Sequence, residues 1–378
     1  MIYLDHCATT PMSEEAGQTY IKTSQSFYGN EQSLHDAGDA AGQLLDHCKK
    51  ELASMLNGEA SGFYFTSGGS DSNITALLSL AYGNQGRGTH IITSPLEHPS
   101  VYQALEKLKS EGFEVEETAV QPNGQISLAS LKELIREDTI LVTICHASSE
   151  TGVIQPIEDI GFLAQEQGIL FHCDAVQTFA KIPIDIKKSG ISALSMSAHK
   201  VYGPKNTGAC YIDPSAAWKS MYPGVVHQHG IKPGTIDVPG IAAFTTAALN
   251  LYEKREQVTA AWRQMQSWFL KQLNDDVFSL IGDKKKRLPH HLALRAHRRE
   301  GQWVMLECNR KNIAISSGSA CKTSYSDPPK SLIAMGCSPE EAHGLFRISF
   351  GVDTTYEELA AVAETLNELA VSSVNVQV

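Results

Sequence analysis

Residues 157–174 read IEDIGFLAQEQGILFHCD and show the clearest structural pattern in the chain. Apolar side chains recur at helical spacing over 157–166, and a short apolar run over 169–173 is typical of a buried strand. A helix that leads into a buried strand is the repeating unit of a parallel sheet covered by helices. The stretch ends on Asp174, a carboxylate at the carboxyl end of the predicted strand.

The same alternation extends in both directions, from about residue 60 to residue 215. Amphipathic helices fit between the apolar runs, for example over 101–111 and 128–136. We therefore expect an α/β fold with a mostly parallel sheet, whose ligands bind beyond the carboxyl ends of the strands. The predicted strands are 62–65, 90–93, 140–144, 169–173, 194–197 and 209–212.

The length of 378 residues favours one large and one smaller domain. A long helical pattern over about 242–274 resembles a connector between them. The last hundred residues carry a few predicted strands and helices, which is typical of an α+β unit. We predict a large domain over 12–255 and a small domain formed by 1–11 and 256–378. The small domain's predicted strands are 292–296, 313–316 and 345–349.

The composition excludes several classes of protein. A net charge of −11 argues against a general nucleic-acid binder. The basic run Lys284–Arg287 is interpreted as a solvated face, with a docking surface for an acidic partner or RNA as the alternative. The cysteines show no paired spacing, so neither a zinc ribbon nor a disulfide framework is indicated. Without a signal peptide pattern or an apolar run of about 20 residues, we expect a cytoplasmic protein with no membrane span.

One cysteine stands apart from the others. Cys321 ends the run Ser316–Cys321, whose small side chains predict a flexible surface loop. Cys308, by contrast, follows large apolar residues, as a buried structural thiol does. The composition of the loop leaves open whether Cys321 is reactive. Other motifs of the chain have to indicate what its thiol would react with.

Three further segments carry polar groups to predicted strand ends. Thr66–Asn73 forms either a tight turn with a helix cap or a small phosphate cradle, to which Ser70 adds a hydroxyl. Asp174 either caps a helix or holds a protonated ring nitrogen. Lys200, in Ser197–Lys200, is either an exposed lysine or an amine that forms a Schiff base. Their order along the chain is typical of a pyridoxal-phosphate site.

On these segments the chain resembles the cysteine desulfurases of the NifS/IscS type, in the class V aminotransferase family of fold-type I pyridoxal-phosphate (PLP) enzymes. The resemblance implies a large domain with a mostly parallel seven-stranded sheet and a smaller α+β domain. It runs nearly from end to end. The motifs that carry it are Tyr3–Asp5, Ala8–Pro11, Gly29–Asn30, His35, Glu97–His98, Asp174–Ala175, Gln177, Ser197–Lys200, Tyr202–Lys205, Ser316–Cys321, Arg347, Ser349 and Gly351.

The resemblance implies a role for each matched residue around the cofactor, PLP. Lys200 would attach the cofactor and later move the Cα proton. Asp174 would hold the pyridinium nitrogen, Gln177 and Ser149 would contact the ring hydroxyl, and His98 would stack on the ring and serve in acid–base steps. The expected phosphate contacts are Gly69, Ser70, Ser197 and His199, with Thr235 reaching the phosphate of the neighbouring subunit. That last contact implies a homodimer.

The resemblance also implies the reaction. Arg347 and Ser149 would bind the carboxylate of the substrate, L-cysteine. Cys321 would take the sulfur as a persulfide and release L-alanine, because a thiolate is the sulfur nucleophile. The sulfur would then pass to a protein acceptor, an iron–sulfur scaffold or a tRNA-thiolation enzyme. No metal and no direct nucleic-acid contact is expected.

Several positions depart from the family pattern. His6–Cys7 replaces a more usual Asn-Ala or Tyr-Ala pair, and Ser148–Ser149 replaces an Asn-Asn pair. Val225–Gln228 replaces a Gly-Gly-Gln-Glu run, and Lys232 replaces an arginine. The alternatives are therefore a selenocysteine lyase, another fold-type I enzyme such as an aminotransferase, or a diverged non-catalytic scaffold. An aminotransferase has no use for Cys321, and a scaffold would bind no coloured cofactor.

Overall fold

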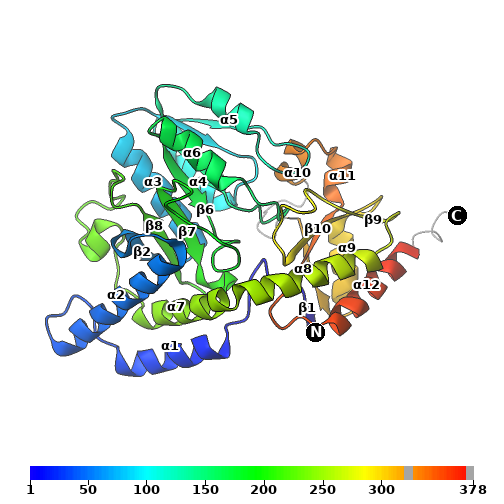
Figure 1. Cartoon of the computed structure of the whole chain (residues 1–378), viewed down its shortest axis with the longest axis horizontal. Helices are drawn as coiled ribbons and strands as arrows, with labels where there is room; N and C mark the ends of the chain where they lie inside the picture. Colours follow the sequence, from blue (N-terminus) through cyan, green and yellow to red (C-terminus); the bar gives the residue numbers. More distant parts are fainter. Residues whose placement is uncertain (319–326, 372–378) are drawn as a thin grey trace.

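The structure is a computed structural model that describes residues 1–318 and 327–371. Its larger part is built on a seven-stranded sheet with strand order β2-β8-β7-β6-β5-β3-β4 (Figure 1). The neighbours from β7 through β6, β5 and β3 to β4 are parallel, whereas β8 is antiparallel to β2 and β7. The predicted α/β fold is confirmed. The strands are β2 (Phe63–Thr66), β3 (His90–Thr93), β4 (Glu114–Glu117), β5 (Thr139–Cys145), β6 (Leu170–Asp174), β7 (Ala193–Ser197) and β8 (Gly208–Ile212).

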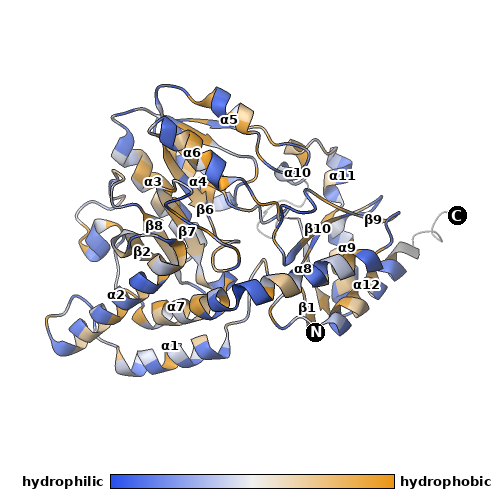
Figure 2. Ribbon diagram, viewed as in Figure 1, coloured by the Kyte–Doolittle hydropathy of each residue, from blue (hydrophilic) through white to orange (hydrophobic). Residues whose placement is uncertain are grey.

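Neighbouring residues of the central strands enter two different apolar cores. Ile91 packs on one face with Leu77 and Leu105, whereas Ile92 enters the core on the other face with Phe244. Successive side chains of a strand point to opposite faces, so a sheet covered on both sides needs apolar residues at every position. The covering helices are α3 (Gly69–Asn84) and α4 (Pro99–Ser110) on the first face, and α2 (Asp36–Leu56), α6 (Ile157–Glu166) and α7 (Val238–Glu253) on the second. The exposed side of α6 is mostly hydrophilic (Figure 2), whereas α7 is covered in turn by α1 (Glu14–Ser26).

The predicted connector is two helices rather than one. α7 ends at Glu253 and α8 (Arg255–Gln272) begins two residues later, with Lys254 between them. α8 runs from the central sheet to a second sheet of order β12-β13-β10-β9 (Figure 1). The remaining strands are β1 (Ile2–Tyr3), β9 (Phe278–Leu280), β10 (His291–Ala296), β11 (Ile313–Ala314), β12 (Ser316–Ser317) and β13 (Leu345–Ser349). The remaining helices are α5 (Leu128–Leu134), α9 (Gly301–Arg310), α10 (Lys330–Ala334), α11 (Pro339–His343) and α12 (Tyr356–Val371).

The basic run 284–287 is only partly the solvated face that we expected. Its three lysines are exposed, but Arg287 is fully buried. The guanidinium group donates to four backbone carbonyls, those of Thr151, Ile281, Asp283 and His291. Burial lowers the pKa of Arg287 to about 10, which still leaves the side chain charged at neutral pH. Arg287 thus ties the loop after β5 to the second sheet.

Replacing Arg287 with methionine should lower the free energy of unfolding by about 3 kcal/mol, because four buried carbonyls lose their donor. The neighbouring exposed Lys285 provides the matched control. Lys285→Met should change the unfolding free energy by less than about 0.5 kcal/mol. Urea denaturation of both variants checks the difference, and equal values would show that Arg287 is not a structural tie.

Candidate active site

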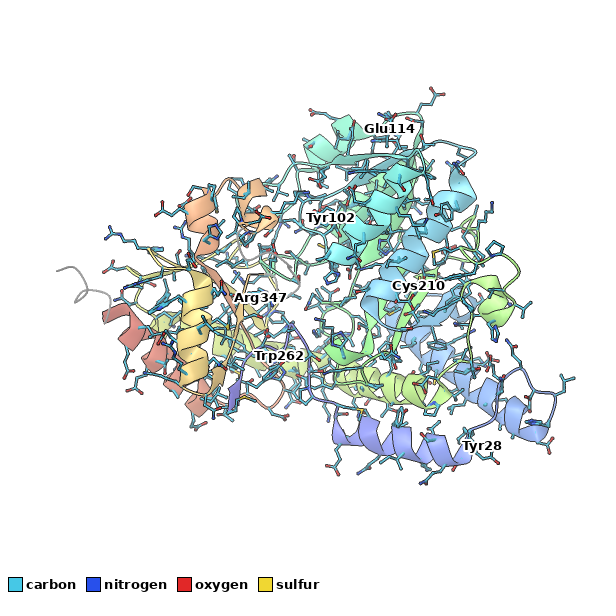
Figure 3. All side chains as sticks on the ribbon, turned by 180° about the vertical axis from the view of Figure 1, so that it is seen from behind. Tyr28, Tyr102, Glu114, Cys210, Trp262 and Arg347 are labelled. Atoms are coloured by element: carbon cyan, nitrogen blue, oxygen red, sulfur yellow. The ribbon has the colours of Figure 1, made fainter. Side chains whose placement is uncertain are left out.

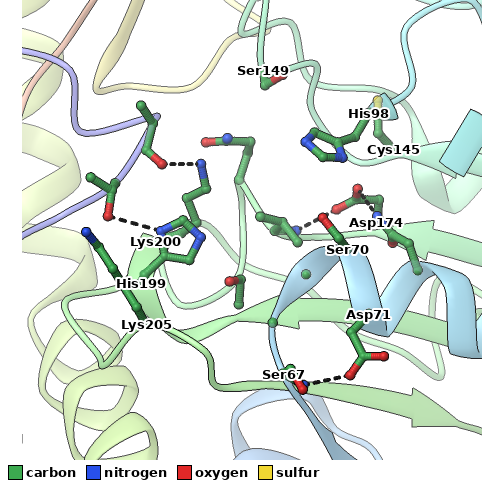
Figure 4. A pocket seen from close by; sticks show the side chains of 18 of the residues that line it. Ser67, Ser70, Asp71, His98, Cys145, Ser149, Asp174, His199, Lys200 and Lys205 are labelled. Atoms are coloured by element: carbon green, nitrogen blue, oxygen red, sulfur yellow. Dashed lines mark hydrogen bonds between the residues drawn. The ribbon is translucent and has the colours of Figure 1, made fainter. Parts of the chain in front are cut away.

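A cavity of about 550 Å³ opens where β6 and β7 end, beside the first turn of α3 (Figure 4). This position agrees with the general rule that α/β sheets bind ligands beyond the carboxyl ends of their strands. Nine of the residues expected at the site line the cavity: Gly69, Ser70, His98, Ser149, Asp174, Gln177, Ser197, His199 and Lys200. The chain fold therefore brings together segments that are widely separated in the sequence.

Lys200 ends the short helical turn Ala198–Lys200, which directly follows β7. Its Nζ donates hydrogen bonds to the carbonyl oxygens of Cys7, at 2.5 Å, and Ala8, at 2.7 Å. The N-terminal segment is held in place by Thr10, whose backbone N–H and hydroxyl both donate to the His199 carbonyl. The primary amine is thus directed along one wall of the cavity.

The first turn of α3 has the geometry of an anion cradle. Gly68 has a φ of 132°, which side-chain-bearing residues rarely adopt, and Gly69 is the first helical residue. A Cβ at Gly69 would lie 2.6 Å from Val176 Cγ2, so the close approach of these segments requires glycine. The helix N-terminus turns backbone N–H groups and a positive dipole toward the cavity. Of the two interpretations of Thr66–Asn73, the geometry favours the phosphate cradle.

Two of the expected phosphate ligands have suitable surroundings. Ser197 Oγ is buried and has no hydrogen-bond partner within residues 1–318 and 327–371. Burial, with added repulsion from Lys200, Lys181 and Lys205, lowers the pKa of His199 to about 4, so its ring is neutral at physiological pH. His199 Nδ1 pairs with Thr9 Oγ1 at 3.1 Å. Both side chains are available to hydrogen-bond an anionic group.

Asp174 is the last residue of β6 and is only 6% exposed. Its Oδ1 accepts from the Val176 backbone N–H at 2.9 Å, as a turn-capping carboxylate does. Its Oδ2 accepts from Asn73 Nδ2 at 2.7 Å. No helix follows Asp174, so it caps a turn rather than a helix. It also lines the cavity, and its role toward a ring nitrogen stays a prediction.

The cavity fits PLP. Beside the unpartnered Ser197 Oγ, the Gln177 Oε1 is buried without a partner among the described residues, while Gln177 Nε2 donates to the Cys7 carbonyl. A phosphate cradle, a buried carboxylate and a primary amine lie around the same space. These are the groups that a phosphorylated, protonated pyridine aldehyde requires.

Arg347 lies on β13, on the second sheet (Figure 3), and does not belong to the residues that line the cavity. Its side chain is 4% exposed, and Nη1 donates to the Ser149 carbonyl at 2.8 Å. Nη2 lies 3.7 Å from Asp5 Oδ1. Ser149 therefore meets Arg347 through its backbone rather than its hydroxyl. The substrate-carboxylate role of both residues stays a prediction.

Thr235 is exposed and is not among the residues that line the cavity, so its contact with a neighbouring subunit stays a prediction. Cys321 lies outside the described residues. The described base of its loop is tied to the N-terminal segment, because Ser316 Oγ donates to Asp5 Oδ2 at 3.1 Å.

Sequence reasoning gave no role to three polar residues near the site, Asn73, Glu97 and Ser100. Asn73 closes the Thr66–Asn73 run and Glu97 belongs to the Glu97–His98 motif, whereas the only signal for Ser100 was its place two residues after His98. Glu97 is 7% exposed and accepts from Ser94 Oγ and the Cys145 backbone N–H, while its Oε2 has no partner among the described residues. Burial raises the pKa of Glu97 to about 8.

The raised pKa predicts a pH-dependent stability. Below about pH 8 folded Glu97 keeps its proton, whereas the unfolded side chain loses it above about pH 4.5. Stability should therefore fall as pH rises through that window, by about 1.4 kcal/mol per pH unit. Glu97→Gln should remove this slope, so the difference in unfolding free energy between the variant and the wild type should shift in favour of the variant as the pH rises. Denaturation at both ends of the window checks this, with exposed Glu106→Gln as the control that keeps the wild-type slope.

The comparisons with known proteins agree with this geometry. The chain matches the family "Aminotransferase class-V" over residues 2–362. It is 45% identical to the putative cysteine desulfurase NifS of Bacillus subtilis, over 98% of this chain and 94% of that protein. It is 36% identical to the cysteine desulfurase IscS of Neisseria meningitidis, over 97% and 91%. A solved NifS-like protein superposes with a TM-score of 0.91 at 29% identity, covering 98% and 99% of the two chains.

A structure of SspA in complex with cysteine superposes with a TM-score of 0.82 at 30% identity, over 93% of this chain and 99% of that one. In the part of the chain that the structure describes, no helix is long and apolar enough to cross a bilayer. Within the same residues, His, Cys, Asp and Glu side chains form no group of three or more that could hold a metal ion.

Proposed function

We propose that this chain, which belongs to the class V aminotransferase family and within it to the NifS/IscS-type cysteine desulfurases, converts L-cysteine to L-alanine with Cys321 as the sulfur acceptor. The observation that carries the proposal is the convergence of Lys200, Asp174 and the α3 cradle on one cavity. These groups match the family's cofactor, PLP. When bound, PLP supplies an electron sink that stabilises the charge left after a bond at the substrate Cα breaks.

The residues around the cavity divide the task of holding that cofactor. Asp174 would hold the ring nitrogen, since a buried carboxylate favours its protonated form. Gln177 and Ser149 would contact the ring hydroxyl. The phosphate would lie against the α3 N-terminus, with Gly69, Ser70, Ser197 and His199 as its contacts.

The chemistry of the protein's own groups follows from their positions. Lys200 would attach the cofactor and hold or move the substrate's Cα proton at Nζ. Arg347 would bind the substrate carboxylate, which requires it to exchange its present contacts with Ser149 and Asp5. The Cys321 thiolate would attack the substrate sulfur, so that a sulfur–sulfur bond forms while the carbon–sulfur bond breaks. Alanine leaves, and the persulfide passes its outer sulfur to a protein acceptor.

The proposal also covers the oligomeric state, the location, the sulfur acceptor and the domain division of the protein. A cytoplasmic homodimer, in which Thr235 serves the neighbouring subunit, would pass sulfur to an iron–sulfur scaffold or a tRNA-thiolation enzyme. The two sheets and the helix break at Lys254 support a division into 12–255 and 1–11 with 256–378.

The test is to incubate the protein with PLP, cysteine and a reductant, and to measure alanine and sulfide together. Mass analysis should find one added sulfur on Cys321. The Cys321→Ala variant should form alanine about 100-fold more slowly, because the sulfur has lost its acceptor. Cys337→Ala, which removes a partly exposed thiol elsewhere, is the matched control and should keep the wild-type rate. Undiminished alanine formation by Cys321→Ala would contradict the persulfide mechanism.

A further inference from the structure

A chain of hydrogen bonds through Ser100 and Asn73 connects His98 to Asp174, two residues that line the cavity (Figure 4). His98 Nδ1 lies 2.8 Å from Ser100 Oγ. Asn73 Nδ2 donates both to Ser100 Oγ, at 3.0 Å, and to Asp174 Oδ2, at 2.7 Å. The two linking side chains are almost inaccessible, with Asn73 1% and Ser100 2% exposed. Water therefore competes little for these bonds.

The Asp174 end of this chain fixes the orientation of the Asn73 amide. A carboxylate only accepts, so Asn73 must turn its NH2 group toward Asp174. One of the two amide hydrogens goes to Asp174, and the other goes to Ser100 Oγ. The Ser100 hydroxyl can direct its one hydrogen to His98 Nδ1, which then accepts. Because a hydroxyl oxygen can accept two hydrogen bonds, this contact permits the assignment but does not require it.

A second contact leads independently to the same assignment. His98 caps the N-terminus of α4, and its Nδ1 accepts from the Ser100 backbone N–H at 3.2 Å. A backbone N–H can only donate, so a proton on Nδ1 would place two donors against each other. The lone pair on Nδ1 is thus required by the helix cap and is compatible with the contact to the Ser100 hydroxyl.

The charge state of the ring completes the picture. Burial lowers the pKa of His98, and repulsion from Lys200 lowers it further, while Asp174 and Glu150 act in the opposite direction. A neutral imidazole carries its single proton on one nitrogen. Because Nδ1 is an acceptor, that proton is on Nε2, the nitrogen that is not used by the cap.

We propose that His98 acts in this enzyme as a neutral hydrogen-bond donor through Nε2, and that Ser100 and Asn73 are positioning residues that fix this tautomer. The inference rests on the proposed function and narrows the acid–base role that the resemblance implied. In this tautomer Nε2 lacks a lone pair and cannot take a proton from the substrate. The base that removes the Cα proton is then Lys200, as the resemblance implies.

The tautomer can be read directly by NMR on the full-length, cofactor-loaded protein labelled with 15N-histidine. The His98 signals are identified by their loss in His98→Gln. Between about pH 6 and pH 8 the spectrum should show a ring protonated on Nε2 only. A proton on Nδ1, or a doubly protonated ring near neutral pH, would overturn the proposal.

Ser100→Ala removes the hydroxyl donor but keeps the backbone N–H. The minor Nδ1-protonated population should rise about two- to tenfold, as expected for the loss of one hydrogen bond. Ser100→Thr retains the hydroxyl and should restore the wild-type spectrum. An unchanged tautomer ratio in Ser100→Ala would remove Ser100 from its positioning role.

Activity provides a second readout. His98→Gln keeps an N–H donor that cannot ionise, and it should stay within about tenfold of the wild-type rate, whereas His98→Leu should lose about 10²-fold. Equal losses of rate in His98→Gln and His98→Leu would contradict a role for His98 as a hydrogen-bond donor alone. The NMR result does not depend on turnover, so a protein with the expected tautomer that forms no alanine would contradict the proposed function alone.

Discussion

Replacing Lys200 with alanine is expected to slow the conversion of cysteine to alanine by about 10⁴-fold, the largest loss that we predict for any one side chain. General acid–base catalysis contributes about 10²- to 10⁴-fold, and a nucleophilic amine adds to it. Both roles fall to Lys200 if His98 is a fixed donor. The amine is already directed into the cavity by the Cys7 and Ala8 carbonyls.

Three measurements separate this role from a general effect of charge. Lys200→Arg keeps a cation but has no nucleophilic amine, so it should be as inactive as Lys200→Ala. Lys187, an exposed lysine remote from the cavity, is the matched control, and Lys187→Ala should be fully active. Borohydride treatment of the wild type should trap the cofactor on the peptide that contains Lys200. A trapped cofactor on another lysine would contradict the assignment.

The fold was predictable wherever burial imposes a continuous apolar run. The predicted strand 90–93 matches β3, and 169–173 matches β6 within one residue. β4 was missed because its sequence is Glu-Val-Glu-Glu: it is the edge strand of the sheet, and only its valine is partly buried. The break between α7 and α8 was missed because Lys254 interrupts neither the hydrophobic spacing nor the helix propensity.

Individual residues of the site were predictable from the sequence, but the contacts between them were not, because those contacts join distant parts of the chain. His98 considered alone is typical of a helix N-terminus, and the structure shows that it is indeed the N-cap of α4. It also lines the cavity, so the structural interpretation is confirmed while the functional one stays a prediction. The Asn73–Asp174 bond joins two segments more than a hundred positions apart, and neither carries a local signal for the other. Contacts of this kind can be identified only in the folded structure.

Asp174→Asn tests the cofactor site and the hydrogen-bond chain together. The loss of the carboxylate should weaken PLP binding about 10- to 100-fold, the usual value of a hydrogen bond to a charged group. Catalysis should fall about 10³-fold, because the ring nitrogen would no longer be held in its protonated, electron-withdrawing form. Spectroscopic titration with PLP and the alanine assay measure the two losses. Asp159→Asn, on the exposed first turn of α6, should change neither.

The same substitution should also change the tautomer ratio of His98, although Asp174 makes no direct hydrogen bond to His98 among the contacts described above. In Asp174→Asn the new amide side chain can still accept from the Val176 N–H through its oxygen, but its NH2 group then faces Asn73 Nδ2. Asn73 must turn its carbonyl oxygen toward this NH2 group, and Ser100 Oγ loses its incoming donor. The Ser100 hydroxyl can then donate to the Asn73 carbonyl oxygen instead of His98 Nδ1, so the Nδ1-protonated form should become more populated. If Asp174→Asn weakens PLP binding yet leaves the His98 tautomer ratio unchanged, the two ends of the chain are not coupled, and only the backbone cap fixes His98.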